Sequence, residues 1–129
     1  MEKPFNFVFI GRSGSGKGVQ SDLLMKKFLY LKHIVTGEMF RNLSSRDTDT
    51  AHRINQTLKR GGLPFDDLAT MLWMHEIAFT IKEKDGILLD GAPRRVVEAE
   101  NLERFLDFLE RGENTFIIFL DTTREEAEK

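Results

Sequence analysis

A glycine-rich loop after an apolar run near the N-terminus constrains the fold of this chain more than any other feature. The apolar run covers residues 5–10, and Gly11, Gly16 and Lys17 follow it, with four residues between the two glycines. This spacing is that of a P-loop up to its last position, and the residues after it have a helical pattern. We therefore predict a buried strand, a loop around a polyphosphate, and a helix whose N-terminus faces the same anion.

Backbone groups and one cation carry the chemistry expected of this loop. Glycines allow the backbone to approach phosphate oxygens where a Cβ would interfere, and Lys17 is expected to bind the β and γ phosphates. The predicted phosphate-binding residues are Gly11, Gly14, Ser15, Gly16, Lys17, Gly18 and Val19. A flexible glycine turn is the alternative. Because neither Gly18 nor Val19 has the hydroxyl that usually ligates magnesium after this lysine, the loop is not expected to hold the metal in the usual way.

The composition limits the class of protein. The 129 residues are 40% hydrophobic, which suits one folded domain, and the formal charge of -2 provides no global field for nucleic acid or an anionic membrane. The absence of cysteine excludes disulfides and fits a reducing compartment. No stretch approaches the roughly 18 apolar residues of a membrane span. We expect a cytoplasmic protein, a monomer by default, with no nucleic-acid or membrane partner.

Strand and helix patterns alternate along the rest of the chain, which predicts a parallel sheet with helices on both faces. Beyond the first strand, we expect strands at 33–35, 87–90 and 115–120, and helices at 16–29, 39–43, 51–60, from 66 onward and at 99–109. In such sheets the ligand binds at the carboxyl ends of the strands. Gly11, Thr36, Asp90 and Asp121 all lie at or just past such an end.

Apolar spacing also predicts which helix faces are buried. In the first helix we expect Leu23, Leu24 and Phe28 to pack on the sheet. In the helix after residue 66, one face carries Leu68, Met71, Leu72, Ala78 and Phe79, and another carries Trp73 and Ile77. The methionines and the tryptophan are expected in the core. His33, His52 and His75 lack metal-ligand spacing, and we expect structural roles for them.

Four segments, at residues 14–18, 36–41, 61–64 and 88–94, together resemble the adenylate kinase family of nucleoside monophosphate kinases. The resemblance covers nearly the whole chain and implies a three-layer P-loop NTPase-type α/β fold. It implies a single P-loop kinase domain over residues 1–129 with an incomplete core, because the family continues with a lid, and this chain would form roughly the N-terminal two-thirds. Residues 36–64 would form a helical insert that closes over the nucleoside monophosphate.

The resemblance also implies an activity, the transfer of the ATP γ-phosphoryl group to AMP with Mg²⁺ accompanying ATP. Lys17 would bind the donor phosphates, Arg41 and Arg94 would clamp the acceptor phosphate, and Asp90 would orient the water shell of magnesium. Lys17, Asp90 and Arg94 would be the catalytic residues. The implied acceptor site contains Thr36, Arg41, Gly62, Leu63, Pro64, Gly91, Arg94 and Glu98. Exposed surface arginines, and a helix cap or a Lys17 partner at Asp90, are the alternatives.

Glu98 departs from the family, where a glutamine reads the acceptor adenine. A carboxylate can only accept hydrogen bonds, so we expect AMP to be preferred with weakened discrimination against GMP. Alternatively, Glu98 points to solvent at the helix start. Two other functions stay open: a nucleotide-binding module with little or no catalysis, and a related kinase with another acceptor such as GMP.

Overall fold

The computed structural model describes residues 3–11, 17–62 and 67–120. Strands and helices alternate along these residues, as the sequence pattern predicts. In chain order the elements are β1 (Asn6–Gly11), α1 (Lys17–Lys27), β2 (Leu31–Val35), α2 (Thr36–Ser44), α3 (Asp49–Lys59), α4 (Asp67–Thr80), β3 (Gly86–Asp90), α5 (Val96–Phe108), a 3-10 turn (Gly112–Asn114) and β4 (Thr115–Leu120). No helix within these three ranges is both long and apolar enough to cross a membrane.

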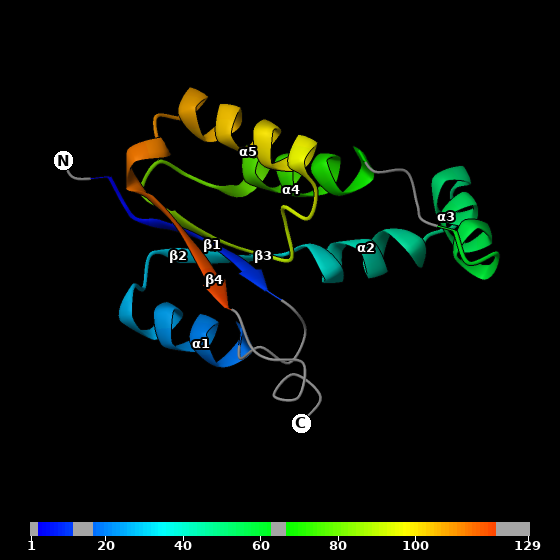
Figure 1. Cartoon of the computed structure of the whole chain (residues 1–129), viewed down its shortest axis with the longest axis horizontal. Coiled ribbons are helices and arrows are strands. Elements are labelled where there is room, and N and C mark those ends of the chain that lie inside the picture. Colours follow the sequence, from blue (N-terminus) through cyan, green and yellow to red (C-terminus); the bar gives the residue numbers. More distant parts are fainter. Residues whose placement is uncertain (1–2, 12–16, 63–66, 121–129) are drawn as a thin grey trace.

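Within the described residues, four strands form one parallel sheet in the order β2-β3-β1-β4. Val8 of β1 lies opposite Leu89 of β3 on one side and Ile117 of β4 on the other. Helix α1 covers one face of the sheet, and α4 and α5 cover the other (Figure 1). This arrangement confirms the predicted three-layer α/β fold.

Side chains of β1 alternate between two hydrophobic cores, because successive residues of a strand point to opposite faces of the sheet. Phe7 and Phe9 pack on the α1 face with the buried Leu31 and Leu88 and the partly buried Leu24, Met25, Phe28, Tyr30 and Ile118. Val8 packs on the other face with Ile34, Trp73, Ile77, Ile87, Leu89, Ala92, Leu102 and Leu106. Each fully buried large apolar side chain stabilises the fold by about 1.5–3 kcal/mol.

The core position predicted for Trp73 in α4 is confirmed, but the larger of the two predicted apolar faces is wrong. Trp73 and Ile77 are the buried residues of this helix, whereas Met71 is 45% and Phe79 is 76% exposed. The ring of His75 stacks on Phe79 with the centroids 4.4 Å apart. Since α4 is apolar almost all round, periodicity could not select the face that α5 and the sheet would cover.

Helix α1 also differs from its prediction, and α5 differs in its bounds, Val96–Phe108 rather than 99–109, but not in its buried face. Leu24 and Phe28 pack on the sheet as expected, but Leu23 is 55% exposed, and the helix ends at Lys27 rather than at residue 29. In α5, the expected face reaches the core through Leu102, Leu106 and the partly buried Phe105 and Leu109.

A buried arginine joins three segments at the amino ends of the strands. Arg111 donates through Nη1 to Asn6 Oδ1 at 2.9 Å and to the Asp85 carbonyl at 2.7 Å, and through Nη2 to the Lys82 carbonyl at 3.1 Å. Burial lowers the pKa of Arg111 from its ordinary value, and the charge of Asp85 opposes this shift. This network fixes the end of the sheet opposite to the expected ligand site.

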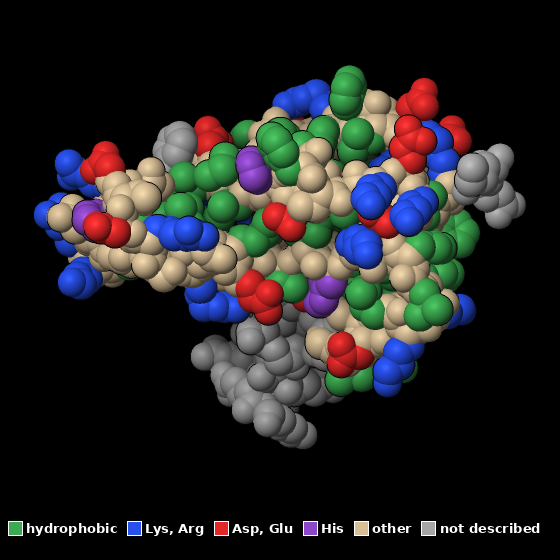
Figure 2. Space-filling model, turned by 180° about the vertical axis from the view of Figure 1, so that it is seen from behind, with side chains coloured by type: hydrophobic (Ala, Val, Ile, Leu, Met, Phe, Trp, Pro, Cys, Tyr) green, Lys and Arg blue, Asp and Glu red, His purple; other side chains and the backbone are tan. Residues whose placement is uncertain are grey.

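Helices α2 and α3 occupy most of the predicted insert and extend beyond the sheet (Figure 1). Helix α3 begins after Thr48, whose side-chain oxygen accepts a hydrogen bond from the Ala51 amide at 3.1 Å. Ala51 and Ile54 are the buried residues of this helix. Seen from behind, charged side chains cover the protruding part of the molecule (Figure 2). The role of the insert as a closing flap stays a prediction.

Strand β4 lies at an edge of the described sheet and pairs there with β1. Its residues Phe116, Ile117 and Phe119 are 48%, 59% and 70% exposed. Several apolar side chains of β4 are therefore left uncovered by the described part of the chain.

Candidate functional site

The parallel register brings three predicted site residues to one end of the sheet. Gly11 ends β1 and Asp90 ends β3, and Thr36 directly follows β2. Asp90 lies opposite Phe9 of β1 and opposite Val35 of β2. The carboxyl ends of the strands therefore assemble Gly11, Thr36 and Asp90, as expected for a ligand site in a parallel sheet.

Thr36 and Gly91 pack against each other where β2 and β3 end. Thr36 is 4% exposed, and its Oγ1 donates to the Asp90 carbonyl at 3.2 Å. Gly91 has a φ of +94°, and a Cβ at this position would collide with Thr36 Oγ1. Only glycine suits both the left-handed backbone and the close approach, so the turn after Asp90 has a fixed shape.

The carboxylate of Asp90 has a neighbour that sequence reasoning missed. His33 Nε2 lies 3.5 Å from Asp90 Oδ2, and the side chains are 30% and 14% exposed. The sequence alone predicts only a structural role for His33, because no metal-ligand spacing surrounds it. The parallel pairing of Val35 with Asp90 was the missing information, since it places His33, two residues earlier on β2, beside the end of β3.

Arg94 and Glu98 form one hydrogen-bonded unit at the start of α5. Arg94 is exposed, its Nε donates to the Gly91 carbonyl at 3.0 Å, and its backbone N–H donates to Glu98 Oε1 at 2.6 Å. Glu98 lies in the first turn of α5 and is 7% exposed. The alternative in which Glu98 points to solvent is therefore wrong, and its carboxylate is held beside the Gly91–Arg94 turn.

The insert contributes Arg41 and Gly62 to the predicted acceptor site. Arg41 is exposed in the last turn of α2. After α3, Gly61 has a φ of +74°, and the Gly62 amide donates to the Thr57 carbonyl at 3.0 Å. These contacts define the backbone that leads out of α3. Binding of the acceptor by Arg41 and Gly62 stays a prediction.

Part of the predicted phosphate loop lies outside the described residues, namely Gly14, Ser15, Gly16 and the side chain of Lys17. Leu63 and Pro64 of the predicted acceptor site also lie outside them. Lys17 begins α1, close to the predicted start of the first helix. Gly18 has open space around the position of a Cβ, and Val19 is 64% exposed. The described part of the chain therefore leaves the positions of these two residues uncrowded.

The donor set suits a magnesium ion that keeps most of its water. No group of three or more His, Cys, Asp or Glu residues that could hold a metal occurs in the described part of the chain. Asp90 supplies one carboxylate at the carboxyl ends of the strands. Because Mg²⁺ usually retains several waters and binds through one or two carboxylates and substrate phosphates, a single carboxylate fits this metal.

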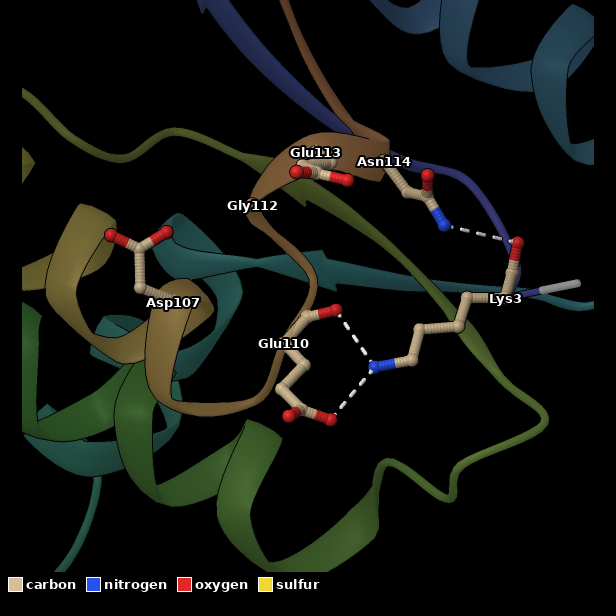
Figure 3. A pocket seen from close by; sticks show the side chains of 6 residues that line it. All are labelled: Lys3, Asp107, Glu110, Gly112, Glu113 and Asn114. Carbon is tan, nitrogen blue, oxygen red and sulfur yellow. Dashed lines mark hydrogen bonds and ion pairs between the residues drawn. The ribbon is translucent and has the colours of Figure 1, made fainter.

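A shallow cavity at the opposite end of the sheet is not this site. It has a volume of about 400 Å³ and is lined by Lys3, Asp107, Glu110, Gly112, Glu113 and Asn114 (Figure 3). Lys3 Nζ donates to the Glu110 carbonyl at 2.9 Å and lies 3.3 Å from Glu110 Oε2. These residues precede β1 and β4, so the cavity faces the amino ends of the strands, and its carboxylates disfavour a phosphate ligand.

Known proteins of one family match most of the length of this chain. The model of the adenylate kinase family matches residues 9–128. Over 126 residues the chain is 33% identical to an adenylate kinase of Thermosipho africanus, and this matched region covers 96% of this chain and 56% of the relative. An adenylate kinase of Thermosipho melanesiensis is 36% identical over 120 residues, or 93% of this chain and 55% of the relative. The chain thus spans about half the length of these curated relatives, less than the expected two-thirds.

Proposed function

The chain belongs to the adenylate kinase family, and we propose that it transfers the γ-phosphoryl group of ATP to AMP, which yields two molecules of ADP. The observation that carries this proposal is the rigid turn Asp90–Arg94 at the carboxyl ends of the strands. Thr36 and Gly91 fix its backbone, and Glu98 and the Gly91 carbonyl fix Arg94. Phosphoryl transfer needs such fixed positions, because the protein contributes mainly alignment and charge.

In the proposed reaction, a phosphate oxygen of AMP attacks the γ-phosphorus of ATP, and the bond from that phosphorus to the bridging oxygen of ADP breaks. Lys17 would hold the donor phosphates from the start of α1. Arg94 would hold the acceptor phosphate, since its Nε is occupied by the Gly91 carbonyl and its outer N–H groups suit the oxygens of a phosphate. Arg41 would bind the same phosphate from the insert.

Asp90 would orient the water molecules of magnesium. When bound with ATP, the metal supplies positive charge at the transferred phosphate. The Thr36 hydrogen bond to the Asp90 carbonyl keeps the end of β3 in place, and the carboxylate would accept hydrogen bonds from those waters. We also infer that the protein acts in the cytoplasm, since a chain without cysteine fits a reducing compartment. The proposed reaction would give it a role in nucleotide biosynthesis.

A coupled assay of the 129-residue chain with ATP, Mg²⁺ and AMP tests the activity. We expect ADP formation that falls by about two orders of magnitude in Arg94→Met. Arg104→Met is the matched control, because Arg104 is an exposed arginine of α5 outside the turn, and it should keep the activity of the unaltered chain. ATP binding without any ADP formation by the unaltered chain would favour the nucleotide-binding module. Faster turnover with GMP than with AMP would favour a kinase with another acceptor.

A further inference from the structure

One face of α4 is exposed although the helix has the composition of a buried one. Two of its 14 residues are acidic, and none is lysine or arginine. A helix that is apolar all round is usually buried on all sides. Trp73 and Ile77 lie in the core that α4 shares with the sheet and α5, whereas Met71 and Phe79 are exposed. The outer face of α4 therefore resembles a buried surface that the described part of the chain leaves uncovered.

Three exposed residues of this face form a row, which we call the α4 stripe: Met71, His75 and Phe79. Because they are spaced by four residues, they lie along one side of the helix over about 12 Å. The rings of His75 and Phe79 stack, with the centroids 4.4 Å apart and the planes at 26°. Apolar side chains gather over α4 on the face of the molecule that is seen from behind (Figure 2). The stripe contains none of the predicted site residues.

We propose that the α4 stripe is an interaction surface for a second copy of this chain, and that the two stripes lie antiparallel across a two-fold axis through His75. In such a pair the same surface serves both copies, so His75 meets His75 and Met71 meets Phe79. The inference goes beyond the proposed reaction and does not depend on it. It replaces the monomer expected from the sequence.

The shape of the stripe suits such a pair. Side chains at positions i, i+4 and i+8 form a ridge, and packing two ridges of this kind is the commonest contact between helices in globular proteins. Met71 is unbranched and flexible, and its sulfur makes favourable contacts with aromatic rings. Since the rings of His75 and Phe79 are already stacked, little side-chain freedom is lost when the second copy binds.

The charges at the two ends of α4 favour an antiparallel copy of the same helix. Asp67 begins the helix, and the exposed Lys82 and Lys84 follow its end, with Glu83 between them. An antiparallel pair brings the acidic start of each helix to the more basic turn of the other. It also places the positive end of each helix dipole beside the negative end of the other. A parallel pair would bring like ends together, so it is disfavoured.

One helix from each copy makes a small interface. Stable protein pairs usually bury about 1,200–2,000 Å² in total, and weak pairs bury less. We therefore expect a weak dimer with a dissociation constant on the order of 10–100 µM. Association through the edge of β4 would leave the α4 stripe exposed, so contacts at α4 itself have to be measured.

Single cysteines measure these contacts, because the chain itself contains no cysteine. His75→Cys lies on the proposed axis and should form an intermolecular disulfide about tenfold faster than Phe108→Cys. Phe108 is the matched control, since it is 80% exposed at the end of α5. Met71→Cys and Phe79→Cys should each couple slowly alone, because equal residues would lie about 12 Å apart. An equimolar mixture of these two variants should couple about as fast as His75→Cys.

Sedimentation equilibrium of the whole chain gives a second measurement. Phe79→Glu should raise the dissociation constant of the dimer about tenfold, because it places an unpaired carboxylate in each half of the interface. Phe108→Glu should leave the constant unchanged. Both positions are exposed, so neither variant should lower the melting temperature by more than a few degrees.

Three outcomes would overturn the proposal. Equal coupling rates of His75→Cys and Phe108→Cys would show that the copies do not meet at α4. Fast coupling of Met71→Cys with itself would contradict the antiparallel orientation. Equal dissociation constants for Phe79→Glu and Phe108→Glu, with association lost in Ile117→Lys, would assign the contact to the edge of β4 instead.

Discussion

Gly91 shows how a single residue can set the shape of the candidate site. It combines a φ of +94° with a close approach to Thr36 Oγ1. We predict that Gly91→Ala lowers the free energy of unfolding by about 1–3 kcal/mol, since both the backbone strain and the collision must be relieved. Urea denaturation measures this change. Gly18→Ala is the control, because its position in α1 has open space, and there we expect a gain of about 0.5–1 kcal/mol.

Glu98 gives a prediction about the acceptor base. Its Oε1 accepts from the Arg94 amide, and the oxygen of a glutamine could do the same. The second atom would then change from an acceptor to a donor, which suits adenine N1, whereas the carboxylate suits the N–H groups of guanine. We expect Glu98→Gln to raise the AMP-to-GMP ratio of kcat/KM by a factor of about 5 to 150. An unchanged ratio would show that Glu98 does not read the base.

Site residues could be predicted from the sequence where local patterns decide their place. Asp90 and Thr36 follow β-prone runs, so the end of a strand was enough to bring them together. The contact of His33 with Asp90 could not be found in this way, because it depends on β2 being the neighbour of β3 and on their register. The buried position of Glu98 depends similarly on the packing of α5.

Among the structural elements, the strand ends near Arg111 give the clearest stability prediction. Arg111 is 7% exposed, and its guanidinium serves acceptors from Asn6, Lys82 and Asp85. We predict that Arg111→Met lowers the free energy of unfolding by about 2–4 kcal/mol, because buried acceptors lose their donor. Urea denaturation would show this loss.

The control for Arg111 is Arg53→Met on α3, where the arginine side chain is 78% exposed and lies 3.9 Å from Asp49. Exposed pairs of this kind contribute little, so we expect a change within about 0.5 kcal/mol. Equal effects of the two substitutions would contradict the assignment of Arg111 as the residue that joins the strand ends.

Helices could be predicted from the sequence in their number and order more reliably than in their buried faces. The spacing in α5 identified Leu102 and Leu106 correctly because its opposite face is charged. In α4, apolar residues surround the axis, so spacing alone could not show that the face of Trp73 is buried and that of Phe79 exposed, although Trp73 was expected in the core. The predicted strand ranges were close to the observed ones because turn residues bound the strands on both sides.

At the scale of the whole molecule, the alternation of strands and helices determines the fold class, because parallel strands need crossover connections. It does not determine the order β2-β3-β1-β4, in which β3 lies between two strands that precede it in sequence. That order depends on which faces the helices can cover, and it is also what leaves β4 at an edge of the described sheet.

The edge position of β4 predicts low stability and self-association of the 129-residue chain, with weak activity at most. Phe116, Ile117 and Phe119 are exposed, and the strand contains none of the charged or proline residues that protect sheet edges. We expect a free energy of unfolding at or below about 5 kcal/mol and light scattering that rises with protein concentration. A high melting temperature together with turnover typical of the family would contradict this expectation.

A charge on the edge strand should distinguish association by strand pairing at the edge from association through exposed apolar surface in general. Ile117→Lys places an ammonium group on β4 and should reduce the concentration-dependent scattering several-fold at little cost in stability, because Ile117 is already 59% exposed. Phe108→Lys is the matched control, since Phe108 is 80% exposed but ends α5 rather than lying on an edge strand. If both substitutions reduce scattering equally, exposed apolar area alone drives association, and the free edge of β4 has no special part in it.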